Sequence, residues 1–152
     1  MITFNIEPFS QVYGELCAIL EAHYREISHH HEHGFLLNPQ VESYRAREAD
    51  GSLMMVIGRK DGEIVAYYVC FIAPGLHYKD CLTCSPDIFY VKESERHSSA
   101  GIRMFRFIQK ELKRRGVKLW FMGSKNAHDS TAIFRRLGAK PVETTYSLWL
   151  ED

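Results

Sequence analysis

Three strand-like segments follow one another between residues 52 and 91, and this run constrains the fold more than any other feature. They span residues 52–59, 63–73 and 80–91 and are rich in β-branched and aromatic residues, which favour strands. Asp61-Gly62 separates the first two and is a strong hairpin signal. Because hairpins join antiparallel strands, the sequence predicts an antiparallel run at the centre of a sheet.

Helical segments lie on both sides of this run. Apolar side chains at helical spacing, N-capping residues and terminal glycines predict helices over residues 11–27, 39–49, 99–115 and 129–137. In the first of these, His23 is expected at the edge of the apolar stripe, next to the polar Arg25 and Glu26.

Short strands are expected over residues 2–6, 117–122 and 144–150. The element order is then β, α, α, β, β, β, α, β, α, β. A hairpin run followed by strand–helix–strand connections requires a mixed sheet with helices on both faces. We therefore expect an α/β (α+β mixed) fold in a single domain that spans residues 1–152.

Pro86 lies inside the third strand of the run. Because proline cannot donate to a strand ladder, a bulge, a kink or a locally unpaired edge is expected there. Bulges often lie beside active sites. In a strand of regular alternation, Ser85, Asp87 and Phe89 would share one face.

Composition narrows the functional classes. The chain has 19 basic and 19 acidic residues, so it lacks the basic excess of a nucleic-acid-binding protein. No apolar run approaches the roughly 20 residues that span a bilayer, and the amino terminus does not resemble a signal peptide. We expect a cytoplasmic protein with neither a nucleic-acid nor a membrane partner.

Two groups of residues suggest a metal site. Cys81 and Cys84 have CxxC spacing, but a strand would direct them to opposite faces, and buried thiols are the simpler interpretation. The segment 29–33 carries four histidines and one glutamate, which fits either a local metal site or a solvated loop. We expect no metal cofactor.

The segment 87–102 reads as a strand, a loop of small residues and a helix start. Free N–H groups and the positive end of a helix dipole meet at such a point, which favours phosphate binding. Arg96 would add a fixed positive charge. The pattern is neither GxxxxGK[ST] nor GxGxxG, and an ordinary strand-to-helix connection is the alternative.

The run Arg96-His97-Ser98-Ser99-Ala100-Gly101 resembles the acetyl-CoA signature [RQ]-x-x-G-x-[GA] of the GCN5-related N-acetyltransferases (GNAT superfamily). Residues 132–139 are similar to the family's A-x-x-Y-x-x-L-G-F helix end. The element order is also the family's, so the resemblance covers nearly the whole chain. The runs 23–26, 76–78 and 87–91 look more narrowly like small members from tailed-phage genomes.

The resemblance implies a mostly antiparallel, twisted sheet of six to seven strands with about four helices. The sheet would splay between its fourth and fifth strands, where the pantetheine arm of acetyl-CoA lies. By the same resemblance, the cofactor contacts would come from Tyr90, Val91, Arg96, His97, Ser98, Ser99, Ala100, Gly101, Ile102, Asn126 and Phe134.

Two residues depart from the family pattern. Ser99 replaces the first motif glycine, and serine would be strained if that position required a positive φ. Phe134 stands where many members have the tyrosine that protonates the leaving thiolate. Tyr146, another group or water could supply that proton, or the step needs no acid, because a thiolate leaves readily near neutral pH.

The implied activity is transfer of an acetyl group from acetyl-CoA to a primary amine of a small molecule or a protein. The acceptor ammonium must first lose a proton to a base. Asp87 is the first candidate for this base, followed by His77 and His23, while Glu26 and Tyr78 would shape the acceptor site. Glutamates concentrated in the amino-terminal third favour a cationic acceptor.

Two other functions remain open at this point. Ser99 and Phe134 would also suit a non-catalytic acyl-CoA-binding or protein-interaction module on the same fold. The histidine segment would suit a metal-binding protein. A homodimer is compatible with any of these functions.

Overall fold

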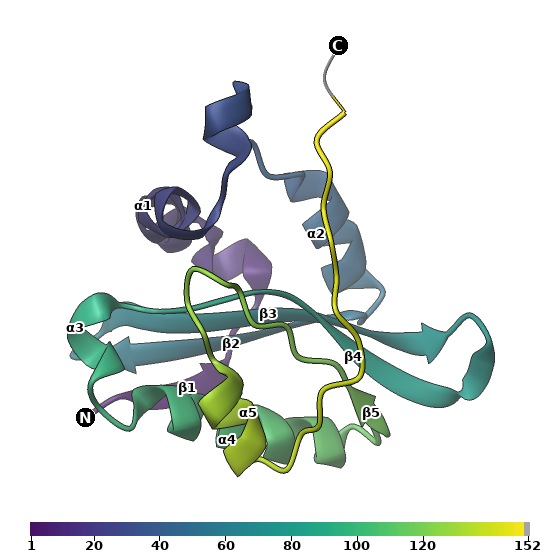
Figure 1. The fold of residues 1–152 in the computed structure, drawn as a ribbon. Helices are drawn as coiled ribbons and strands as arrows, with labels where there is room; N and C mark the ends of the chain where they lie inside the picture. Colours follow the sequence, from purple (N-terminus) through teal and green to yellow (C-terminus); the bar gives the residue numbers. More distant parts are fainter. Residues whose placement is uncertain (151–152) are drawn as a thin grey trace.

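A five-stranded sheet forms the centre of the computed structural model, which describes residues 1–150 (Figure 1). The strands are β1 (Thr3–Ile6), β2 (Leu53–Lys60), β3 (Glu63–Gly75), β4 (Tyr78–Val91) and β5 (Leu119–Trp120). They lie in chain order, antiparallel from β1 to β4, and β4 pairs with β5 in parallel. A mixed, mostly antiparallel sheet is confirmed, whereas the expectation of six to seven strands is wrong.

The missing strand is the one expected over residues 144–150. This segment has no strand pairing in the described chain, and Tyr146, Leu148 and Leu150 are largely exposed. Sequence alternation shows that a segment could form a strand, but a strand also requires an edge to pair with. The neighbouring edge is short, since β5 contributes only two residues.

The helices are α1 (Phe9–Ile27), α2 (Val41–Ala49), α3 (Glu93–Arg96), α4 (Ala100–Arg114) and α5 (Thr131–Arg136), with a 3₁₀ turn η1 at His30–His33. The four predicted helices are confirmed with small differences at their ends. The short α3 and η1 were not predicted. Across residues 1–150, no helix is both long and apolar enough to span a bilayer.

Helices cover both faces of the sheet, as expected (Figure 1). On one face α4 packs Met104, Phe105 and Ile108 against Tyr68 and its neighbours. On the other face, α1 packs Val12 and Leu16 against β2 and β3. The sheet is therefore buried on both sides, and any cavity must lie at the edges of these two layers or between the helices and the sheet.

The buried side of α1 differs from the predicted stripe. Phe9, Val12, Leu16 and His23 are buried, whereas Cys17 is exposed. His23 retains only 4% of its accessible surface, so it lies inside the core and not at its edge. The helix begins two residues earlier than predicted, and Phe9 is its first buried residue.

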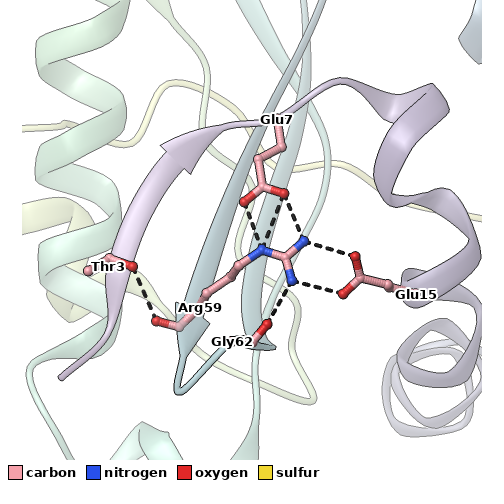
Figure 2. A network of polar contacts seen from close by, with 5 residues as sticks. All are labelled: Thr3, Glu7, Glu15, Arg59 and Gly62. Carbon is pink, nitrogen blue, oxygen red and sulfur yellow. Dashed lines mark hydrogen bonds and ion pairs between the residues drawn. The ribbon is translucent and has the colours of Figure 1, made fainter.

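The β2–β3 turn has the predicted form. Asp61 and Gly62 both have positive φ, at 53° and 88°, as a tight hairpin turn requires. Next to this turn, Arg59 connects three elements (Figure 2). Its guanidinium donates hydrogen bonds to the carboxylates of Glu7 and Glu15 and to the carbonyl of Gly62. This network fixes the start of α1 against the hairpin.

Candidate functional site

A β-bulge in β4 determines where the Asp87 side chain lies. Ile88 pairs with Val69, and Pro86 pairs with Cys70, so Asp87 has no partner on β3. The bulge confirms the irregularity expected at Pro86. It also overturns the expectation that Asp87 and Phe89 share a face, because the extra residue shifts the alternation of the strand.

The two side chains now lie on opposite faces. Phe89 packs against Phe105 and Phe134 on the α4 side of the sheet. Asp87 lies on the α1–α2 side, where the Tyr44 hydroxyl donates a hydrogen bond of 2.6 Å to its Oδ2. Burial, and then this bond to Asp87, raise the pKa of Tyr44, so its phenol stays protonated. Tyr44 therefore fixes the direction of the Asp87 carboxylate.

The open edge of β4 borders a first cavity. β4 pairs with β5 only at Thr83 and Cys84, so the rest of β4 lacks a strand partner on that side within the described residues. This matches the expected splay. A cavity of about 240 Å³ lies along this edge. Its lining includes Phe89, Tyr90 and Val91 from β4, Arg96 and Gly101 from the following segment, and Ser130 and Ile133 from the α5 region.

The loop at the end of this cavity leads into α4, and within it Ser98 N–H donates to the carbonyl of Glu95 and Ala100 N–H donates to Ser98 Oγ. α4 begins at Ala100, and the N–H groups of its first turn have no acceptor within the helix. Ser99 has a φ of −78°, so serine is unstrained there and the glycine of the family motif is not required. Gly101 is closely packed, since a Cβ at that position would lie 3.0 Å from Cδ1 of Ile133 and that side chain would have to shift.

Arg96 is already paired. Its Nε donates to the carbonyl of Val91 at 2.8 Å, and its two terminal nitrogens contact the Glu26 carboxylate at 2.6 and 2.9 Å. Hydrogen bonding from Arg96 lowers the pKa of Glu26, which also contacts His128. Arg96 thus ties α1 to the loop, and the positive charge expected from the sequence is balanced by Glu26 in this structure.

His23 lines both this cavity and a second, larger one. Its ring contacts the rings of Tyr67 and Tyr90, and its Nδ1 is hydrogen-bonded to the Tyr67 hydroxyl. Burial lowers the pKa of His23 to about 4, so the imidazole is neutral at pH 7. His23 is therefore a neutral polar group at the junction of two cavities.

The larger cavity, of about 760 Å³, lies between α1, α2 and the sheet. Residues 35–39 and 147–149 line its outer side. Its lining is mainly apolar, and among the lining residues Asp87 alone carries a carboxylate. The cavity therefore combines an apolar interior with one anionic group on the sheet.

The other predicted site residues are placed differently. His77 and Tyr78 are exposed at the β3–β4 turn and line neither cavity. Phe134 is buried in the core with Phe105, and Asn126 lies exposed in the loop before α5. His97, Ser98 and Ser99 are exposed at the start of α4, Ala100 is buried, and Ile102 is half-buried.

Sequence reasoning missed Tyr44, Tyr67 and His128. Each of them acts through a partner more than 40 residues away in the chain, and no local pattern signals such a contact. Within residues 1–150, no group of three or more His, Cys, Asp or Glu residues could hold a metal ion. In the histidine segment His29 contacts Glu32, and His33 stacks on Trp149.

No protein-family model and no curated protein matches this sequence. Solved structures do match its fold. A ribosomal-protein-alanine N-acetyltransferase from Brucella melitensis biovar Abortus 2308 has a TM-score of 0.72 at 10% identity, over 99% of this chain and 100% of that one. A predicted acetyltransferase from Clostridium acetobutylicum, solved with acetyl-CoA, has a TM-score of 0.71 at 12% identity, over 97% and 96% of the two chains.

An aminoglycoside acetyltransferase from an uncultured soil metagenomic sample, in complex with sisomicin, has a TM-score of 0.74 at 10% identity, over 99% of this chain and 97% of that one. At these identities the likeness establishes the fold. The chain has the fold of these acetyltransferases, as its resemblance to the GNAT superfamily predicted.

Proposed function

We propose that this protein is an acetyl-CoA-dependent N-acetyltransferase that acetylates a primary amine by direct attack. The observation that carries the proposal is the meeting of two cavities at His23. A transfer between two substrates requires two binding sites that share one reacting point. The acetyltransferase fold and a neighbour solved with acetyl-CoA support this assignment.

The smaller cavity is the proposed site of acetyl-CoA. The open edge of β4 offers the backbone groups of Tyr90 and Val91 to the pantetheine arm. The pyrophosphate would accept hydrogen bonds from N–H groups between His97 and Ile102, where the helix dipole also favours an anion. Arg96 contributes a second positive group if its pairing with Glu26 opens.

The larger cavity is the proposed acceptor site. Asp87 is the first candidate base, because its carboxylate faces this cavity from the strand that borders the smaller one. His23 is the second candidate: in the tautomer whose Nδ1–H donates to the Tyr67 oxygen, Nε2 has a lone pair that could accept a proton. His77 lines neither cavity and is the weakest of the three predicted bases.

The reaction then has two steps. The base removes a proton from the ammonium, and the neutral nitrogen attacks the thioester carbonyl. The C–S bond of the tetrahedral intermediate then breaks, CoA leaves as a thiolate, and the nitrogen loses its second proton to water to give the neutral amide. Tyr146 is 89% exposed and lines neither cavity, and the buried Phe134 has no proton to donate. Departure as the thiolate, with later protonation by water, fits these residues best.

Thermal unfolding with and without acetyl-CoA tests the binding step, because a ligand of the native state raises the melting temperature. We expect stabilisation of the wild type and of Arg106→Ala, a control on the exposed side of α4. Gly101→Leu should abolish it, since its side chain would enter the smaller cavity beside Ile133.

Turnover is tested by mass spectrometry of acetylated product and by release of free CoA thiol over a panel of primary amines. Asp87→Asn should slow turnover far more than it weakens acetyl-CoA binding. Stabilisation by acetyl-CoA without any product would favour the non-catalytic acyl-CoA-binding module. Absence of both stabilisation and product would refute the proposal.

A further inference from the structure

We propose that the larger cavity selects a primary amine carried on an aromatic or similarly apolar body, with a single positive charge. This inference rests on the proposed function, and it goes further by naming the class of acceptor. It follows from the size and lining of the cavity, the position of its one carboxylate and the aromatic wall on its outer side.

The size of the cavity fits a small molecule. Binding sites for small ligands commonly enclose about 300–1,000 Å³ and are lined mainly by apolar side chains. This cavity encloses about 760 Å³. Leu16 and Leu20 of α1 form one wall, and Met55, Val69 and Ile88 of the sheet form the floor. Such a lining favours an apolar body, because each buried polar group of a ligand would need a partner here.

The cavity offers one carboxylate as a partner for one ammonium group. Asp87 supplies the one carboxylate of the lining. The Tyr44 hydroxyl donates a hydrogen bond to its Oδ2 and so fixes the orientation of the carboxylate. The other oxygen, Oδ1, can then accept a hydrogen bond from a ligand. Lys125 also lines the cavity and would repel further positive charges. A polycation would therefore have to bury several charges against a single carboxylate, which is costly.

The outer side of the cavity is aromatic. The Trp149 ring stacks on His33 with centroids 3.9 Å apart and on Phe35 at 5.9 Å. The Tyr24 hydroxyl donates to the carbonyl of Phe35, which ties this wall to α1. Aromatic rings bind other aromatic rings through stacked and edge-on contacts. A ligand whose ammonium lies at Asp87 on the sheet would direct its body toward Phe35 and Trp149.

Direct binding in the absence of acetyl-CoA tests the inference independently of catalysis. Isothermal titration would compare 2-phenylethylamine, its uncharged analogue 2-phenylethanol, and spermidine, a polycation without an apolar body. We expect 2-phenylethylamine to bind at least about tenfold more tightly than either of the other two. A tenfold difference in affinity corresponds to about 1.4 kcal/mol of binding free energy.

Two variants locate the charge. Asp87→Asn should weaken 2-phenylethylamine binding by about tenfold and leave 2-phenylethanol binding unchanged. Asp80→Asn is the matched control, because Asp80 is an exposed acid on the same strand that does not line the cavity, and its affinities should equal those of the wild type.

Equal or tighter binding of spermidine, no measurable binding of 2-phenylethylamine, or an unchanged affinity in Asp87→Asn would each overturn the inference. Failure of the proposed function gives a different result. In that case 2-phenylethylamine would bind as expected, while acetyl-CoA would give neither stabilisation nor product.

Discussion

His23 has lost most of its contact with water, and this determines its protonation state. The imidazole contacts two tyrosine rings and bonds to the Tyr67 hydroxyl, and its burial lowers its pKa to about 4. An unfolded chain exposes the same imidazole, whose pKa is then near 6.5. The unfolded state therefore binds more protons than the native state between these two values.

The free energy of unfolding should consequently depend on pH through His23. His23 makes its full contribution to the free energy of unfolding above about pH 6.5. This contribution decreases as the pH falls toward 4, by about 3 kcal/mol in total. Urea denaturation at a series of pH values measures it. In His23→Gln this part of the pH dependence should disappear, whereas the exposed His77→Gln should retain it. Parallel curves for wild type and His23→Gln would contradict the prediction.

At the scale of elements, the hairpin and the bulge were predictable because their signals are local. Asp61-Gly62 specifies its turn through adjacent φ angles, and Pro86 directly precedes Asp87, the unpaired residue of the bulge. The short α3 and η1 contain too few residues to show a helical period. The strand expected over residues 144–150 failed for the opposite reason, because its alternation was clear but its partner was absent.

The Arg59 network gives a prediction at this scale. Arg59 and Glu7 are only 23% and 20% exposed, so their ion pair is better shielded from water than a surface pair. Arg59→Met would leave two glutamates without a partner at the junction of β1, α1 and the hairpin (Figure 2).

We expect Arg59→Met to lower the free energy of unfolding by about 2 kcal/mol, measured by chemical denaturation. Arg45→Met removes the exposed Arg45–Glu42 pair and serves as the control, with an expected loss below about 0.5 kcal/mol. Similar losses in the two variants would show that the network has no special role.

At the scale of the whole molecule, α1 connects the two cavities. It carries His23, which lines both, and Glu26, which holds the Arg96 of the proposed phosphate loop. The fold itself was largely predictable from element order and motif. This site was not, because the pairs Glu26–Arg96, His23–Tyr67 and Tyr44–Asp87 each join distant parts of the chain.

Glu26 should compete with the phosphates of acetyl-CoA for Arg96. Replacing its carboxylate in Glu26→Gln removes that competition while keeping a hydrogen-bond acceptor. We expect acetyl-CoA to bind about fivefold more tightly to this variant, measured by isothermal titration. Glu21→Gln, on an exposed part of the same helix, should bind like the wild type. Weaker binding to Glu26→Gln would instead show that Glu26 positions Arg96 for the ligand.

The bulge also separates the side chain of Asp87, the proposed base, from the residues that pair and pack in the sheet. Asp87 has no partner on β3, while Pro86 and Ile88 keep their own pairs and the aromatic core behind β4 contacts Phe89. A substitution at residue 87 would therefore alter the group presented to the cavity without altering the ladder or the core. A chain with this fold could therefore carry a different side chain at position 87 and keep its strand pairing, although the hydrogen bond from Tyr44 would change.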